Sequence, residues 1–440
     1  MREPADDPVA SPGSGALTRR RLIQGLAVLA PVAMLMKAQS TVAPVRSSVT
    51  SAADVPLSPA VLPAGIRSRF VNSIDGLRMH VLEAGFEVKG RPCVLLLHGF
   101  PELAYSWRKV MLPLASAGFH VIAPDRRGHG RTSGWDVGYD DDLDPFGTLN
   151  QVRDLLGLIS AFGSRSVAAV TGHDHGSPIA AWCSLVRPDV FRSVVMMSAP
   201  FAGPPALPFD TADAAPAEPP VDHIYEELAA LKPPRKYYMK YYATREANEN
   251  MWHAPRGVHA FLRAYYHMKS ADWKQNTPFP LKERTASEWA KLPRYYVMDL
   301  DKGMPETVAP EMPSAAAIAA CKWLPDDELK VYSTEYGRTG FQGGLQGYRL
   351  RWIRKYAAEL QMFSGRTIDV PSLFIAGKSD WGVYQNPGDL EKMQNTACAR
   401  MLGVHLVDGA GHWVQQEQPE AVSQLLVQFL DDKAHRGNTA

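Results

Sequence analysis

The stretch T-G-H-D-H-G-S-P at residues 171–178 has the frame of a nucleophile elbow, the sharp turn from a buried strand into a helix that is usually written G-x-S-x-G. The apolar run Val167–Val170 precedes it, and a helical pattern follows it. Glycines flank such a turn because neighbouring backbone leaves no room for side chains. Here the central position holds Asp174 in place of serine, and His175 comes next. The stretch therefore predicts a carboxylate that points into a cleft at the end of a strand.

The chain around this turn alternates between strand and helix patterns. The hairpin signal Asp75-Gly76 joins the runs 70–74 and 77–82. Helical patterns include Val152–Phe162 and Ala421–Leu430. We therefore predict an α/β fold with a mostly parallel sheet flanked by helices. Continuous apolar runs, typical of strands buried on both faces, are Cys93–Leu97, Val121–Ala123, Val167–Val170, Val194–Met197, Leu373–Ile375 and Val404–Val407.

The alternation breaks over residues 201–347, after the sixth predicted strand. This segment is rich in Pro, Tyr, Trp and charged residues, and it has helical stretches but no series of strands. An insertion above the carboxyl ends of parallel strands covers the site that these ends form. We predict a helical lid here, inserted between two parts of the core at residues 65–200 and 348–434. The lid segment 272–325 has no pattern that we can interpret.

Residues 1–53 are expected to lie outside this fold. Arg19 and Arg20 precede the apolar stretch Gly25–Met36, which is shorter than the ~20 residues of a membrane span. The pattern resembles a twin-arginine export signal followed by a small-residue linker with candidate cleavage sites. We therefore expect a periplasmic or secreted protein whose partner is the export machinery. A disordered basic leader and an uncleaved membrane anchor are the alternatives.

Composition argues against several partners and cofactors. The 440 residues have a formal net charge of +1 and a hydrophobic content of 45%, which gives no electrostatic reason to expect nucleic acid. The four cysteines form no C-x-x-C pair, and we expect them to be reduced packing residues. No pair of histidines with a carboxylate has metal-ligand spacing. We expect neither a metal nor an organic cofactor. We expect His98, His129 and His173 to be structural.

Two backbone N–H groups are expected to form an oxyanion hole beside Asp174. The sequence H-G-F-P at 98–101 follows the first long buried strand, where one of these donors should lie, and Phe100 is the candidate. The second donor is the N–H of His175, which follows the elbow carboxylate directly. Such donors stabilise negative charge that develops on an oxygen during a reaction.

An acid and a histidine are expected to complete the site. Asp380 follows the predicted strand 373–375, and His412 lies on the loop after the strand 404–407. Asp408 is a second candidate for the acid that orients His412. We prefer Asp380 because it ends a strand of its own, whereas Asp408 is expected to brace the loop.

With these segments in place, the chain resembles an α/β-hydrolase of the epoxide hydrolase family. The resemblance covers roughly residues 65–432. Haloalkane and fluoroacetate dehalogenases share the core motifs, so the motifs specify this branch of the superfamily better than they specify the substrate. The motifs are H-G-F-P-E at 98–102 with Y-S-W-R at 105–108, D-R-R-G-H-G at 125–130, G-H-D-H-G at 172–176 and G-H-W-V-Q-Q-E-Q-P-E at 411–420.

The resemblance also implies two lid tyrosines that hold and protonate the epoxide oxygen. G-F-Q-G-G-L-Q-G-Y-R at 340–349 resembles the segment that carries one of them, with Tyr348 at the matching position. Y-M-K-Y-Y at 238–242 resembles the helix of the other and indicates Tyr238, although a neighbouring tyrosine of the run 237–242 is not excluded. Tryptophans in or beside the motifs are expected to contact an apolar substrate: Trp107, Trp381 and Trp413.

The residue types agree with this chemistry. An epoxide offers a saturated carbon. A carboxylate can attack this carbon from the side opposite the ring oxygen without first losing a proton. Asp174 would form an ester with the substrate, and water activated by His412 and Asp380 would hydrolyse it to release a vicinal diol. The expected partners are an apolar epoxide and water.

Differences from the dehalogenases favour the epoxide. Residue 175 is often the halide-binding tryptophan in haloalkane dehalogenases, but here it is histidine, and the Phe100 side chain cannot donate a hydrogen bond. Fluoroacetate dehalogenases place arginines where this chain has His175 and Pro178. Two alternatives stay open: a haloalkane-type dehalogenase with the same Asp174 nucleophile, and a non-catalytic ligand-binding protein of this fold.

Overall fold

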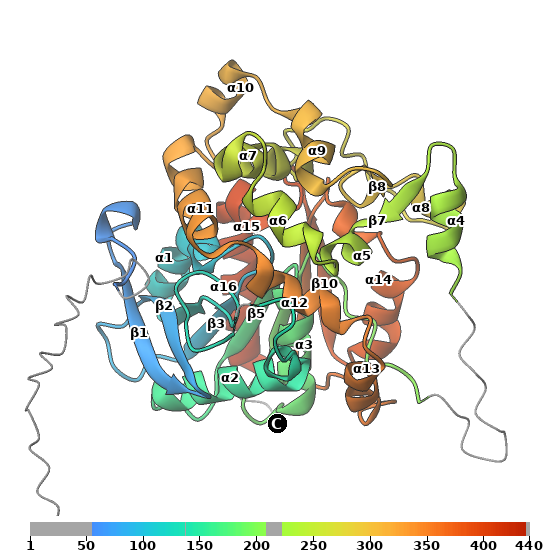
Figure 1. Cartoon of the computed structure of the whole chain (residues 1–440). Helices are drawn as coiled ribbons and strands as arrows, with labels where there is room; N and C mark the ends of the chain where they lie inside the picture. The colour runs from blue at the N-terminus through green and yellow to red at the C-terminus, as the bar shows by residue number, and fades with distance from the viewer. Residues whose placement is uncertain (1–54, 137, 208–221, 437–440) are drawn as a thin grey trace, which may run out of the picture. The chain divides into compact units, whose positions relative to one another are not determined.

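The computed structural model describes residues 55–136, 138–207 and 222–436. The predicted export signal and linker at residues 1–53 lie outside the described residues. Among the described helices, none is both long and apolar enough to cross a membrane. The described chain forms an α/β core with a helical insertion (Figure 1).

The core contains one eight-stranded sheet in the order β1-β2-β4-β3-β5-β6-β9-β10. The pairs β1–β2 and β2–β4 are antiparallel, and the other pairs are parallel. The predicted turn Asp75-Gly76 joins β1 to β2, with both residues at positive φ. The prediction of a mostly parallel sheet is therefore confirmed. The strands are β1 (Ile66–Ile74), β2 (Leu77–Ala84), β3 (Cys93–Leu97), β4 (His120–Pro124), β5 (Ala169–His173), β6 (Val194–Met197), β9 (Ser372–Gly377) and β10 (Met401–Val407).

Side chains of the central strands alternate between two buried clusters. In β3, Leu95 and Leu97 face the cluster that includes α2 and α3, whereas Val94 and Leu96 face the cluster that includes α1 and α16. Both faces of β3 are thus covered by helices, which is why this strand forms a continuous apolar run in the sequence. The core helices are α1 (Arg108–Ser116), α2 (Thr148–Ala161), α3 (Gly176–Val186), α14 (Asp389–Lys392), α15 (Val414–Glu417) and α16 (Pro419–Arg436).

The carboxyl ends of β3, β5, β9 and β10 lie at one edge of the sheet, because these strands are parallel to one another. The loops that leave these four ends carry the predicted site residues Phe100, Asp174, Asp380 and His412. The sheet therefore brings together four residues that are far apart in the sequence.

The insertion after β6 forms a lid over this edge, and Figure 1 shows its helices α5, α6, α7 and α9 above β3 and β5. Two lid tyrosines fasten it to the loop after β3: the Tyr266 hydroxyl donates to the Pro101 carbonyl at 2.9 Å, and the Tyr336 hydroxyl donates to the Glu102 carbonyl at 3.1 Å. The elements of the insertion are α4 (Ile224–Ala230), β7 (Arg235–Tyr237), α5 (Tyr238–Tyr242), α6 (Glu246–Trp252), α7 (Gly257–Lys269), α8 (Ala286–Trp289), β8 (Val297–Asp299), α9 (Met304–Val308), α10 (Ala315–Ala320), α11 (Asp326–Thr339), α12 (Gln342–Leu350) and α13 (Arg354–Gln361).

The insertion differs from the sequence prediction in two ways. It contains a short antiparallel strand pair, β7–β8, which has no recognisable pattern in the sequence because each strand is three residues long. The boundary predicted between residues 347 and 348 falls inside α12, and α13 follows before β9 begins at Ser372. The segment 272–325, which we could not interpret, contains α8, β8, α9 and α10.

A methyl group on Gly176 tests how tightly the first turn of α3 packs against β3. A Cβ at this position would overlap the backbone carbonyl groups of Leu97 and His98. We expect Gly176→Ala to lower the free energy of unfolding by about 1–3 kcal/mol, as overpacking of a core does. Gly337 is the control, because it is exposed in α11 with no atom near its Cβ position. Gly337→Ala should be neutral or stabilising by up to about 1 kcal/mol. Denaturant unfolding measures both, and equal destabilisation would contradict the steric explanation.

Candidate active site

Asp174 follows β5 directly and adopts a left-handed backbone conformation with φ of 50°. A positive φ is uncommon for a residue with a side chain and is typical of functional turns. The Asp174 N–H donates to the Met197 carbonyl at 3.1 Å, and the Asp174 carbonyl accepts from the Ser177 N–H at 3.0 Å. A Cβ on Gly172 would overlap the Gly176 carbonyl. The flanking glycines are therefore required for the turn that the sequence predicts.

One of the two predicted oxyanion donors contacts the carboxylate. The Phe100 N–H donates to Asp174 Oδ1 at 2.9 Å. His175 is the N-cap residue of α3, and its N–H makes no hydrogen bond to Asp174 among the described residues. A donor for a charge that appears only during reaction need not meet the carboxylate in the resting enzyme. The assignment of His175 as second donor stays a prediction.

His412 lies between the carboxylates of Asp174 and Asp380. Its Nε2 is 3.3 Å from Asp174 Oδ2, and its Nδ1 is 3.1 Å from Asp380 Oδ1. Asp380 also accepts a hydrogen bond from the Gly382 N–H at 2.7 Å. Asp408 is exposed and pairs instead with a lysine on the surface. The structure thus brings Asp380, and not Asp408, to the histidine.

Both carboxylates are favoured in their ionised form. Burial raises the pKa of the Asp174 carboxyl, but His412 and then Lys269 and His175 outweigh burial and hold this pKa well below its usual range. Burial likewise raises the pKa of the Asp380 carboxyl, and His412 more than compensates and lowers it. The surroundings of Asp174 therefore favour the carboxylate, which has no proton to lose before it can react.

Tyr348 reaches the site because glycines let α12 approach the core. A Cβ on Gly344 would overlap the Phe100 ring, and a Cβ on Gly347 would overlap the His175 ring. The Tyr348 ring stacks on the His175 ring, with centroids 4.5 Å apart and planes 17° apart. This explains the glycine-rich segment before the tyrosine, and it gives His175 a packing role beside the elbow.

The Tyr348 hydroxyl has no hydrogen bond to any of the described residues. Burial, followed by the negative charge of Asp174, raises the pKa of Tyr348 well above its ordinary value. The side chain is 2% exposed. A buried, protonated and unpaired hydroxyl above a carboxylate is a ready hydrogen-bond donor.

Among the tyrosines of the run 237–242, Tyr238 has the surroundings most similar to those of Tyr348. Its ring lies 6.1 Å from the Tyr348 ring, and Asp174 is one of the charges that raise its pKa. Its hydroxyl has one long hydrogen bond, 3.4 Å to Gln385 Oε1. These relations favour Tyr238 as the second lid tyrosine.

The other tyrosines of this run have further partners, although the Tyr237 hydroxyl also lies 3.4 Å from Gln385 Oε1. The Tyr237 ring stacks on Trp289 at 4.4 Å, and the Tyr241 hydroxyl accepts a hydrogen bond within the lid at 3.3 Å. The Tyr242 hydroxyl donates to the Tyr265 hydroxyl at 3.3 Å. Tyr242 nevertheless packs edge-on against Tyr348, so it is the nearest competitor of Tyr238.

The three predicted substrate-binding tryptophans separate into two groups. Trp381 and Trp413 belong to the buried lid cluster that also contains Tyr238 and Tyr348. Trp107 lies instead in the cluster between the sheet and α1 and α16, so the structure does not bring it to the site. Its motif position beside the loop after β3 suggested a contact, but its side chain turns into the core.

Known proteins resemble this chain over most of its length. A family model described as the alpha/beta hydrolase fold matches residues 92–227. Epoxide hydrolase A of Mycobacterium tuberculosis is 32% identical over 361 residues, which cover 81% of this chain and 95% of that protein. The chain belongs to the epoxide hydrolase family.

Two further comparisons agree. Epoxide hydrolase B of the same organism is 30% identical over 372 residues, covering 81% of this chain and 96% of that protein. The solved structure of an epoxide hydrolase from an endophytic Streptomyces has a TM-score of 0.68 and 29% identity, and covers 85% of this chain and 97% of that one. The predicted family and fold are therefore confirmed.

A buried carboxylate that the sequence reasoning did not single out joins the loop after β3 to the end of β5 and to α15. Glu102 Oε2 accepts from the Gly99 N–H at 3.1 Å and lies 2.6 Å from His173 Nδ1. Glu102 Oε1 accepts from the side-chain amides of Gln415 and Gln416 at 2.9 and 3.0 Å. Glu102 stands within the quoted H-G-F-P-E motif, so its position was visible but its role was not.

His173 continues this network to His412. Its Nε2 lies 2.7 Å from the His412 carbonyl, which accepts the hydrogen bond. Burial lowers the pKa of the His173 imidazole, but Glu102 outweighs burial and raises it. Burial raises the pKa of the Glu102 carboxyl, and His173 in turn lowers it. The pKa directions favour a fully buried ion pair, and these contacts agree with the structural role expected for His173.

Glu417 is a second residue that the sequence reasoning missed. It accepts hydrogen bonds from the N–H groups of Gly411 and Trp413, each at 2.9 Å, and from the Ala271 N–H at 2.8 Å. The two loop donors flank His412 on either side. Glu417 therefore fixes the loop that presents the histidine and ties it to the lid.

Residues that could bind a metal do not gather in the described parts of the chain. No group of three or more His, Cys, Asp or Glu side chains there has the arrangement of a metal site. The four cysteines are free, and Cys93, Cys183 and Cys398 are buried, in agreement with the prediction of packing residues.

The charge of Glu102 is tested by Glu102→Gln, which leaves a buried imidazolium without its partner. We expect the free energy of unfolding to fall by about 3–5 kcal/mol near pH 5.5. The lowered carboxyl pKa contributes stability above about pH 4.3, and this is lost as the pH falls through the lowered value. The raised imidazole pKa contributes stability below about pH 6.5, and this is lost as the pH rises through the raised value. The difference between wild type and variant should therefore shrink as the pH rises above 6.5.

Denaturant unfolding across this pH range measures the effect. Glu420→Gln is the matched control, because Glu420 is exposed at the start of α16, directly after the helix that carries Gln415 and Gln416. It should change stability by no more than about 0.5 kcal/mol. A Glu102 variant with a small or pH-independent loss would show that the pair is not charged.

Proposed function

We propose that this protein hydrolyses epoxides to vicinal diols through a covalent ester on Asp174. The observation that carries the proposal is the position of the Asp174 carboxylate, between the Phe100 N–H and His412 and below the lid tyrosines. A carboxylate is a suitable nucleophile for a saturated carbon, where displacement of the ring oxygen requires attack from the opposite side. A serine esterase instead has a hydroxyl at this turn, which attacks an acyl carbon.

In the first step, an oxygen of Asp174 forms a bond to an epoxide carbon and the ring C–O bond breaks. Oδ1 is held by the Phe100 N–H, so Oδ2 is the attacking oxygen. The ring oxygen leaves as an alkoxide and takes a proton from Tyr348 or Tyr238. Both tyrosines have a pKa raised by burial, so both are protonated when the substrate arrives. Such donors act where negative charge develops in the transition state.

In the second step, His412 Nε2 removes a proton from water, and the resulting hydroxide oxygen attacks the Asp174 carboxyl carbon. The oxyanion forms at Oδ1, where the Phe100 N–H stabilises it. The ester C–O bond then breaks, and the leaving alkoxide of the diol takes the proton from the imidazolium. The Asp174 carboxylic acid, which now holds one oxygen from water, returns its proton to the tyrosinate formed in the first step. Asp380 orients His412 through Nδ1 and stabilises its charged form.

Replacement of His412 should separate the two steps. We expect His412→Gln to form the ester with styrene oxide but to hydrolyse it more than about 1000-fold more slowly than wild type, since the general base is lost. Mass spectrometry of the protein should show an adduct of one epoxide on the peptide that carries Asp174. His405→Gln is the control, because His405 lies on β10, outside the site; it should turn over normally without an adduct.

Labelled water checks the same route in the wild type. After a single turnover in ¹⁸O-water, the label should appear in Asp174 and not in the diol. A diol that carries the label from the first turnover would mean direct attack by water and would contradict the nucleophile. Absence of diol and of adduct with a broad panel of epoxides would contradict the proposed function.

Phenylalanine substitutions identify the two proton donors. Tyr348→Phe and Tyr238→Phe keep the ring packing and remove only the hydroxyl, so each should lower the rate of ester formation by about 100- to 1000-fold. Tyr237→Phe and Tyr242→Phe are the comparison variants and should change the rate less than about fivefold. Pre-steady-state kinetics with styrene oxide measure these rates. A large loss in Tyr242→Phe with little loss in Tyr238→Phe would reassign the second donor to Tyr242.

A further inference from the structure

The two edge strands of the eight-stranded sheet differ in how they meet solvent. β1 carries Arg67 and Arg69, whose partly exposed side chains pair with Glu83. Charged side chains on an edge strand discourage pairing with another chain. β10, at the opposite edge, has the sequence M-L-G-V-H-L-V, without Lys, Arg, Asp, Glu or Pro. Among the described strands it pairs with β9 alone. The outer edge of β10 therefore has a free side for a further strand.

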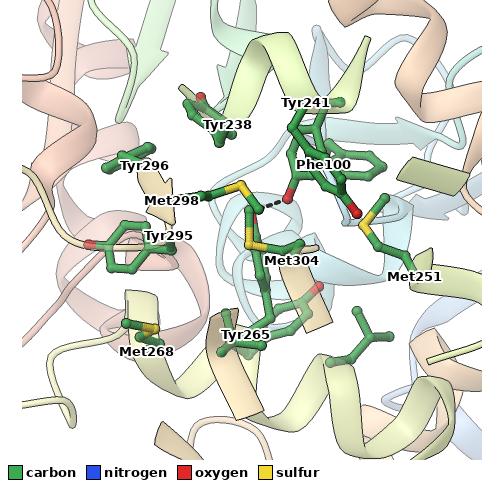
Figure 2. Close-up of a cluster of buried hydrophobic side chains, with 14 of the residues drawn as sticks. Phe100, Tyr238, Tyr241, Met251, Tyr265, Met268, Tyr295, Tyr296, Met298 and Met304 are labelled. Carbon is green, nitrogen blue, oxygen red and sulfur yellow. Dashed lines mark hydrogen bonds between the residues drawn. The ribbon is translucent and has the colours of Figure 1, made fainter. Parts of the chain in front are cut away.

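Two leucines of β10 lie at the surface. Leu402 is 40% exposed and Leu406 is 38% exposed. Most large apolar side chains of the described residues are enclosed instead, as are those of the lid cluster in Figure 2. Exposed apolar side chains on a strand with an unpaired edge are typical of a surface that another strand covers.

The backbone of Val404 and Leu406 supplies the outward hydrogen-bonding groups of β10. At the end of β9, the Lys378 N–H donates to the Val407 carbonyl at 2.9 Å, so this carbonyl faces β9. Successive residues of a strand direct their N–H and C=O groups to opposite sides. The groups of Leu406 and Val404 therefore face away from β9. The register between the two strands shifts only near the start of β10, before this part.

The sequence of β10 and its two flanking residues is complementary to itself in the antiparallel direction. When two copies meet with Val404 opposite Val404, Leu402 lies opposite Leu406, and Arg400 lies opposite Asp408. Both charged residues are exposed. A two-fold axis makes each of these contacts twice. A slip of two residues in either direction would place a charged residue opposite a leucine, so the pattern specifies one register.

We propose that this protein forms a two-fold dimer in which β10 pairs antiparallel with β10 of a second copy, so that the two sheets become one. Backbone hydrogen bonds around Val404, leucine contacts and the ion pairs between Arg400 and Asp408 stabilise the interface. The paired strands run in opposite directions, so the His412 loops that follow them lie at opposite ends of the strand pair. Each copy keeps its own site, and the dimer does not depend on the proposed reaction.

The first test measures the mass of the full chain in solution by analytical ultracentrifugation over a range of concentrations. The wild type should sediment as a dimer that dissociates on dilution. Leu406→Lys places a charge on the outer edge of β10, and the dissociation constant of the dimer should rise at least about 10-fold. Leu300→Lys is the matched control, because Leu300 is 43% exposed in the lid, and it should leave the constant unchanged.

Charge reversal tests the register. In Arg400→Glu, like charges face each other twice, so the dissociation constant should rise about 10- to 100-fold. The double variant Arg400→Glu/Asp408→Arg restores opposite charges across the interface and should dimerise more tightly than either single variant. Arg256→Glu makes the same change of charge at an exposed residue before α7 and should have no effect.

Disulfide formation locates the two-fold axis. Val404→Cys should give a covalent dimer on mild oxidation, because directly opposite residues of an antiparallel hydrogen-bonded pair have Cα atoms about 5.5 Å apart, within the range of a disulfide. In Leu406→Cys the two thiols are separated by four residues along the strands, about 13 Å, and should not join. The wild type, with its four native cysteines, is the background control.

Three results would overturn the proposal. A wild type that stays monomeric up to the limit of its solubility has no such interface. A dimer whose dissociation constant is unchanged in Leu406→Lys and in Arg400→Glu uses another surface. A double charge variant no better than the single ones, together with equal cross-linking at residues 404 and 406, would exclude this antiparallel register.

Discussion

The site depends on one buried carboxylate, that of Glu102. It accepts hydrogen bonds from the loop after β3, pairs with His173 at the end of β5, and accepts from the side chains of Gln415 and Gln416 in α15, which follows His412. Three segments that are distant in the sequence thus share one acceptor. Because an unpaired buried charge is costly, none of these segments can move away without a large loss of stability. Reacting groups held in this way need little reorganisation when the substrate binds.

The lid solves a different problem, since it must enclose an apolar substrate and still supply proton donors. Tyrosine serves both needs, with an apolar ring and a polar end. The tyrosines whose hydroxyls bond the core, such as Tyr266 and Tyr336, fasten the lid. Tyr348 and Tyr296 have hydroxyls without partners in the described residues, and Lys269 has an ammonium without one. These three groups all belong to the inserted lid.

Local patterns predicted the parts of the fold whose conformation is decided by near neighbours. The elbow was recognisable because only glycine tolerates the backbone contacts at residues 172 and 176. The central strands were recognisable because both faces are buried, although β5 begins two residues later than the apolar run that predicted it and extends to His173. The three-residue strands β7 and β8 were missed, since a pattern of period two needs more residues than they have. The export signal at residues 1–53 stays a prediction.

The sequence by itself predicted Asp174, Asp380 and His412 as site residues and the order in which the sheet presents them, because each follows a strand that sequence patterns reveal. Only the tertiary structure showed that Tyr238 and Tyr242 both pack against Tyr348, that Trp107 packs into the core, and that Glu102 joins distant segments. The same holds for the four aromatic rings near Lys269 Nζ, which come from α7, the chain before β8 and the loop that carries His412. Such contacts join residues with no fixed spacing in the chain, so packing alone brings them together.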